Sequence, residues 1–166
     1  GRYFSPGELE RIYVNFPTPH PKAHDARERL TYLDRLLAYR TLLSPAGTLR
    51  LKTDSQPFFA FTLTQLELAG YEVLEKSRDM RAAHPNDPVT GYEERLCAQG
   101  ASVYGIFAAP GPLPERVEQT AALSLMDYLP HDLDSLGYVP LGMERAVENF
   151  RNRRTKLAAR ALSGTR

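Results

Sequence analysis

The sequence predicts an α/β domain with about four strands and flanking helices, followed by a helical tail. Two observations support this. Between residues 11 and 75, segments typical of strands alternate with segments that have helical spacing. This order implies a parallel sheet. The proline-rich stretch 110–114 then separates a first domain, residues 1–109, from a tail, residues 110–166.

The first strand and helix lie on either side of a proline-rich loop. Residues 11–16 are β-branched and aromatic and stop at Pro17, which predicts a buried strand. From about Asp25 to Leu43, apolar residues recur at helical spacing, and the run ends at Ser44–Gly47. We therefore expect one amphipathic helix over 25–43.

The next elements repeat this order. Residues 48–54 alternate as a strand does, and 57–68 have the apolar spacing of a helix. After Gly70, residues 71–75 form the third expected strand. Residues 77–90 carry too many helix and strand breakers to be regular, so a loop is expected there.

A short helix at 92–99 and an apolar strand at 102–107 complete the first domain. In the tail, residues 115–129 and 142–162 both show helical periodicity. The second of these helices ends with a run of basic residues: Arg151, Arg153, Arg154, Lys156 and Arg160.

Composition narrows the class of protein. With 166 residues and 42% hydrophobic content, the chain can bury one compact core. The 21 Lys and Arg residues are nearly balanced by 20 Asp and Glu residues, so nucleic-acid binding would need a local basic patch. The single cysteine, the absence of a long apolar segment and the absence of a signal pattern predict a cytoplasmic protein with no membrane contact. The first residue is Gly1, so we expect that the chain could be a fragment.

Three motifs carry a resemblance to a known family. Asn15–Lys22 reads Asn-Phe-Pro-Thr-Pro-His-Pro-Lys and continues into Arg27–Leu30, Leu43–Leu49 precedes Thr53–Asp54, and Thr90–Glu93 precedes Arg95. In this order and at these distances they resemble the signature of the bacterial tRNA (guanine-N7)-methyltransferases, over about residues 9–108. The resemblance implies the carboxy-terminal half of a class I, Rossmann-like methyltransferase sheet, with tRNA as the partner.

The resemblance also implies roles for single residues. Thr18 stands where the family has the aspartate proposed to act in catalysis beside the methyl donor. Lys22, Asp54, Thr90 and Glu93 match substrate-binding positions, and we expect these four side chains to converge on a purine at the carboxyl end of the sheet. The implied RNA-binding positions are His24, Arg27 and Arg29.

The family cofactor is S-adenosyl-L-methionine, but the sequence contains no Gly-x-Gly turn that would let the backbone approach it. The first strand here corresponds to the fourth strand of the family sheet, so we expect this chain alone to bind no donor. The free inner edge of the sheet would then be covered by a second copy, by the tail helices or by an amino-terminal half.

Several of these residues also fit structural or non-catalytic roles. Asp54 could cap a helix, and Thr90 with Glu93 has the spacing of a capping box. Threonine at position 18 cannot supply the charge of a carboxylate, which favours the alternative of a catalytically inactive, methyltransferase-like protein that binds RNA or a partner. His20, His24 and Asp25 lack a fourth ligand at a recognisable spacing, so no metal site is expected.

Overall fold

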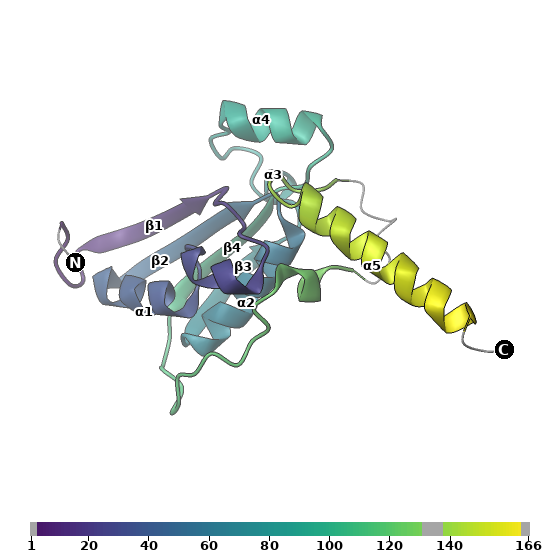
Figure 1. Cartoon of the computed structure of the whole chain (residues 1–166). Helices are drawn as coiled ribbons and strands as arrows, with labels where there is room; N and C mark the ends of the chain where they lie inside the picture. The colour runs from purple at the N-terminus through teal and green to yellow at the C-terminus, as the bar shows by residue number, and fades with distance from the viewer. Residues whose placement is uncertain (1–2, 131–137, 164–166) are drawn as a thin grey trace.

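A four-stranded sheet with strand order β1-β2-β4-β3 forms the centre of the molecule (Figure 1). The computed structural model describes residues 3–130 and 138–163. The strands are β1 (Leu9–Asn15), β2 (Leu43–Thr53), β3 (Tyr71–Ser77) and β4 (Tyr104–Pro110). The predicted α/β fold with about four strands is confirmed.

The sheet is mixed, which corrects the expected parallel sheet. β1 and β2 pair in parallel, but β4 lies antiparallel between β2 and β3. The two helices that join β3 to β4, α3 (Met80–Ala83) and α4 (Gly91–Ala98), stay near the end of the sheet where β1 and β2 finish (Figure 1). After β3 the chain does not cross back over a face of the sheet. It therefore enters β4 from the end at which β3 finishes, and β4 runs antiparallel to both of its neighbours.

The single helix expected over 25–43 is two elements. A short 3-10 helix, η1 (Ala23–Glu28), is separated from α1 (Leu33–Leu42) by an extended Arg29 with φ −66° and ψ 132°. The break turns the Arg29 side chain inward, where it is fully buried. A buried guanidinium needs hydrogen-bond acceptors. For Arg29 these are carbonyl oxygens of the preceding loop, and the helix is interrupted where the side chain turns toward them.

Helices α1 and α2 (Gln56–Leu68) cover one face of the sheet (Figure 1). Ser55, and not Asp54, is the N-cap of α2, since its hydroxyl accepts from the Phe58 N–H at 3.3 Å. Phe58 and Phe61 of this helix are fully buried in the same core as Leu49 and Leu51 of β2. The sheet face under α1 and α2 is therefore the apolar one.

The segment between β3 and α4, expected to be irregular throughout, contains α3. Met80 of this helix is buried, and a Cβ added at Gly105 of β4 would collide with Met80 Cγ. Glycine at position 105 thus leaves the space into which α3 packs.

The tail differs from its prediction in its first half. The helix expected at 115–129 is wrong: the chain there is irregular except for a 3-10 turn, η2 (Leu125–Tyr128). This segment packs on α2, where the side-chain amides of Gln65 and Gln119 exchange hydrogen bonds at 3.1 and 2.6 Å. The final helix is confirmed as α5 (Glu144–Ser163).

The tail shares the core of the first 109 residues. Leu125, Met143 and Val147 belong to the same buried cluster as the sheet. The proline-rich stretch after β4 therefore does not separate two hydrophobic cores. None of the helices in the described part of the chain has the length and apolarity needed to cross a membrane.

Candidate functional site

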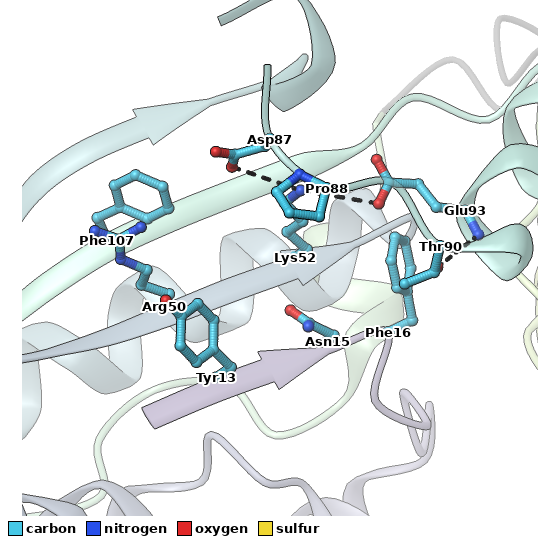
Figure 2. A pocket seen from close by; sticks show the side chains of 10 residues that line it. All are labelled: Tyr13, Asn15, Phe16, Arg50, Lys52, Asp87, Pro88, Thr90, Glu93 and Phe107. Carbon is cyan, nitrogen blue, oxygen red and sulfur yellow. Dashed lines mark hydrogen bonds and ion pairs between the residues drawn. The ribbon is translucent and has the colours of Figure 1, made fainter. Parts of the chain in front are cut away.

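A cavity of about 280 Å³ opens on the sheet face opposite α1 and α2. Arg50 and Lys52 alternate along β2 with the buried Leu49 and Leu51, so they point to this other face. Residues of β1, β4 and the segment 87–93 complete the wall (Figure 2). The lining residues are Tyr13, Asn15, Phe16, Arg50, Lys52, Asp87, Pro88, Thr90, Glu93 and Phe107.

Two carboxylates and one ammonium group meet in this cavity. Lys52 Nζ lies 3.8 Å from Glu93 Oε2 and 3.8 Å from Asp87 Oδ2 (Figure 2). Glu93 is 1% exposed, and its Oε1 is buried without a hydrogen-bond partner. A buried carboxylate oxygen that lacks a donor is costly, so a ligand that brings an N–H group to it would be stabilised.

Thr90 fixes the position of Glu93. The Thr90 hydroxyl caps α4 by accepting from the Glu93 N–H at 3.1 Å. The return bond of a capping box is not made, because the Glu93 carboxylate points into the cavity toward Lys52 (Figure 2). The capping interpretation of this motif therefore accounts for Thr90 but not for the Glu93 side chain.

Aromatic rings form the remaining walls. Arg50 Cζ lies 4.3 Å from the centre of the Phe107 ring and 5.9 Å from that of Tyr13. At the other end, the rings of Phe16 and Tyr92 meet edge to face at 5.4 Å. The cavity thus combines flat apolar walls with a charged end, as a pocket for a planar, polar ring requires.

Asp54 lines a different hollow. Its Oδ2 accepts from the Tyr138 hydroxyl at 2.7 Å, and both residues face a second cavity near the start of α2. Burial raises the pKa of the Tyr138 phenol, and the hydrogen bond to Asp54 raises this pKa further. Burial raises the pKa of Tyr92, and the negative charge of Asp54 raises this pKa further.

The loop with Thr18 is held in an unusual backbone conformation. Phe16 and His20, on either side of the loop, have φ values of 48° and 46°, in the left-handed region that few residues other than glycine adopt. The Arg29 guanidinium stabilises this loop by donating hydrogen bonds to the carbonyl oxygens of Pro19, His20 and Lys22. Thr18 itself is exposed at the tip.

The residues expected to bind RNA separate into two groups. His24 and Arg27 are exposed, and His24 Nε2 lies 3.4 Å from Asp25 Oδ1. Arg29 is 0% exposed and stacks on the Phe61 ring at 4.4 Å. The expectation that Arg29 contacts RNA is corrected, because its guanidinium has no surface to offer and binds the loop carbonyls.

The four expected substrate residues do not share one cavity. Thr90 and Glu93 come together, whereas Asp54 faces Tyr138 and Lys22 is exposed in a hollow beside α5. The expectation of a single cleft is therefore wrong. The fold places the Asp54 and Lys22 side chains in two other cavities.

Lys52, Arg50 and Asp87 are site residues that the sequence interpretation missed. The sequence contains part of the pattern that would have indicated them. Arg50 and Lys52 alternate with apolar residues along an inner strand, so they lie together on the second face of the sheet, which other groups must cover. Among the described residues no cluster of three His, Cys, Asp or Glu could hold a metal ion.

Three features of the described residues concern a site for S-adenosylmethionine. No Gly-x-Gly turn follows a described strand, and β1 pairs with β2 alone among the described strands. The position at which the resemblance implies a catalytic aspartate carries the neutral hydroxyl of Thr18. We therefore assign no residue of this structure to the cofactor.

Comparisons with known proteins agree with the motifs. Residues 1–106 match the sequence model of a family described as "Putative methyltransferase". Similar proteins named tRNA (guanine-N(7)-)-methyltransferase come from Exiguobacterium sp. (strain AT1b), 38% identical over 66% of this chain and 52% of the relative, and from Geobacillus kaustophilus, 38% identical over 66% and 51%. The protein of that name from Geobacillus thermodenitrificans is 39% identical over 66% and 51%. The chain spans about half the length of the curated relatives it matches.

Proposed function

Since this chain belongs to the methyltransferase family that its residues 1–106 match, we propose that it provides the guanine- and tRNA-binding side of an S-adenosylmethionine-dependent tRNA (guanine-N7)-methyltransferase. The relatives that match about two thirds of this chain carry that name. A cytoplasmic location is part of the same proposal, since tRNA would be the substrate.

The proposal is carried mainly by the unpaired oxygen of Glu93. Guanine presents two donors on one edge, N1–H and the 2-amino group, and adenine has no donor at N1. Glu93 lines the cavity, its Oε1 is buried without a hydrogen-bond partner, and its Oε2 lies 3.8 Å from Lys52 Nζ. A guanine whose donor edge meets this carboxylate would satisfy the orphaned acceptor.

The chemistry proposed for the site makes few demands on proton transfer. N7 is a ring lone pair, so its methylation removes no proton, and the purine gains a positive charge. The negative charge of the buried Glu93 would stabilise that positive charge. The role we propose for these residues is to hold the base and its charge, with Thr90 keeping α4 and Glu93 in place.

On the RNA side, we propose that Lys22, His24 and Arg27 face the tRNA, since all three are exposed near the loop that carries Thr18. Arg29 is left out of this set because it is buried. Asp54 remains a proposed substrate residue, reached only if Tyr138 releases it.

Partner contact at β1 is a further part of the proposal. β1 is an edge strand among the described residues, and the Tyr13 side chain on it is 56% exposed. An exposed edge with an apolar ring favours pairing with another strand, from a second copy or from an amino-terminal half.

The test is calorimetry of nucleotide binding to this chain. We expect guanosine 5′-monophosphate to bind about 10- to 100-fold more tightly than adenosine 5′-monophosphate, and inosine 5′-monophosphate, which lacks the 2-amino group, to lie between them. Glu93→Gln should abolish the preference, while Glu94→Gln, an exposed neighbour, should keep it. Equal binding of the three nucleotides by the native chain would refute the proposed guanine site.

One observation favours the alternative function, a methyltransferase-like protein that binds RNA without catalysis. Thr18 puts an uncharged hydroxyl at the loop tip where the resemblance implies an aspartate. The alternative would be supported if a protein that joins this chain to a donor-binding half formed no 7-methylguanosine from unmodified tRNA and S-adenosylmethionine, and recovery of the product with Thr18→Asp would assign the loss to that position.

A further inference from the structure

On one exposed side of α5, five cationic and amide side chains lie in a stripe, with the exposed Glu148 at its edge. Arg145, Asn149, Asn152, Arg153 and Lys156 are all exposed, and their spacing of four, seven, eight and eleven residues from Arg145 places them on one side of the helix. None of the five is acidic. Every side chain on this stripe can therefore donate hydrogen bonds, and three of them carry positive charge.

The opposite side of α5 anchors the helix. Met143 and Val147 are buried at 0% and 1% exposure, and the Ser55 hydroxyl contacts Met143 Sδ at 3.3 Å. From this anchor the helix projects away from the sheet (Figure 1). From residue 145 to residue 156 the stripe is roughly 16 Å long, at about 1.5 Å per residue. The contacts of Met143 and Val147 with the core fix the direction of α5. The stripe along the helix is exposed and accessible to a partner.

The stripe begins in a hollow of about 550 Å³ that also contains Lys22. Arg145 and Asn149 line the hollow from α5, and Lys22 and Asp25 line it from the loop side. Arg145 lies in the first turn of the helix, where the dipole disfavours a cation. Helix stability thus gives no reason for an arginine at this position, whereas the basic residues near the other end could be explained by the dipole alone.

We infer that Lys22, Arg145 and the stripe along α5 bind the sugar-phosphate backbone of tRNA. Cationic and amide side chains are the usual ligands of phosphate oxygens, and an extended row of them can follow one strand. The inference rests on the proposed function for the identity of the RNA. It adds a binding surface that lies beyond the family match at residues 1–106.

The charge pattern fits RNA better than an anionic membrane. A helix that lies on a membrane needs an apolar face to insert, and the apolar residues Met143 and Val147 are buried in the core. Among the described side chains of α5, Leu157 is the large apolar residue that is exposed, at 57%. One exposed leucine does not make an insertion face.

The test measures binding of a fluorescent, unmodified tRNA to the chain as a function of salt concentration. The variant is Arg153→Gln with Lys156→Gln, and the matched control is Lys76→Gln with Arg116→Gln, two exposed cations outside the stripe and the hollow. We expect the stripe variant to lower the slope of log K against log salt by about 2, because about one counterion is released per phosphate contact. The control should keep the native slope.

Three results would overturn the inference: no binding of tRNA by the native chain, equal slopes for the stripe variant and the native chain, or equal losses in variant and control. A fourth is binding of anionic phosphatidylserine vesicles that competes with tRNA and is lost in the stripe variant. The calorimetry of guanine nucleotides depends on Glu93 and not on α5, so equal slopes for the stripe variant and the native chain would overturn this inference and leave the proposed guanine site standing. Absence of tRNA binding by the native chain would count against both this inference and the proposed function.

Discussion

Arg29 holds the carbonyl oxygen of His20 with two hydrogen bonds, from Nε at 3.1 Å and from Nη2 at 2.7 Å. His20 needs such a hold, since its φ of 46° is unfavourable for a residue with a side chain. Burial lowers the pKa of the Arg29 guanidinium to about 10, which still leaves it charged at neutral pH. The loop that carries Thr18 thus depends on a buried cation for its shape.

Replacing this cation should destabilise the protein. Arg29→Met removes the donors and leaves the loop carbonyls without partners, so we expect the free energy of unfolding to fall by about 2–4 kcal/mol. Urea denaturation followed by circular dichroism measures the change. Arg27→Met is the matched control, since Arg27 is exposed two positions away and its loss should cost about 0.5 kcal/mol or less. Similar losses for both variants would contradict the bracing role.

Lys52 and Glu93 should be energetically coupled. Lys52→Met leaves the buried Glu93 carboxylate without its nearby cation, and we expect a loss of about 2–3 kcal/mol at pH 7. In Glu93→Gln the side chain carries no charge, so adding Lys52→Met to that variant should cost about 1–2 kcal/mol less. A double-mutant cycle by denaturation measures the coupling. Strict additivity of the two substitutions would show that the 3.8 Å contact has no energetic role.

Tyr71 should make the protein sensitive to alkali. Burial raises the pKa of this phenol above its ordinary value of 10.0, and its hydroxyl donates to the Leu36 carbonyl oxygen at 2.9 Å. Because the folded pKa is the higher one, the stabilisation is fully present below pH 10 and is lost as the pH rises above it. The unfolding free energy of the native chain should therefore fall above pH 10 by up to about 1.4 kcal/mol per pH unit more than that of Tyr71→Phe.

The comparison is made by urea denaturation between pH 8 and pH 11. At pH 8, Tyr71→Phe should cost about 1 kcal/mol, the value of one buried hydrogen bond. Tyr3→Phe removes an exposed phenol and should follow the native curve. If the native chain and Tyr71→Phe show parallel pH dependence, the buried phenol does not contribute as described.

S-adenosylmethionine should not bind to this chain in calorimetry. The described residues form no Gly-x-Gly turn after a strand, and the site next to the loop offers only the Thr18 hydroxyl. Thr18→Asp restores a negative charge but no pocket, so this variant should bind no donor either. A measurable dissociation constant for the native chain would show that its own residues form a donor site, and a constant found only with Thr18→Asp would show that charge was the missing factor.

Local signals in the sequence predicted most of the fold. The β-branched run before Pro17 and the periodic final helix each specify an element within a few residues. The alternation that ends at Asp54 specifies the end of β2 but not its start, because β2 already begins at Leu43, where the end of a helix was expected. The helix expected over 115–129 failed because that segment packs on α2, and tertiary contacts outweighed its local periodicity. The break at Arg29 could not be seen locally, since it depends on carbonyl groups seven to ten residues earlier.

The candidate site was predicted only in part for a similar reason. Thr90 and Glu93 follow a local motif, so the sequence places them together at the start of a helix. The motif does not say that the Glu93 carboxylate turns toward Lys52, about forty positions earlier in the chain, because that contact requires α4 to lie beside the end of β2.

By itself, the sequence determined the family, the strands and helices that repeat a short period, and the residue types that a guanine site would need. The tertiary structure alone decided which of those residues meet. It buried Arg29, turned Asp54 to Tyr138 and joined Glu93 to Lys52. The physical reason is range: a period of two or 3.6 residues is set by neighbours in the chain, whereas a buried charge takes its partners from whichever segments the packing of the core brings to it.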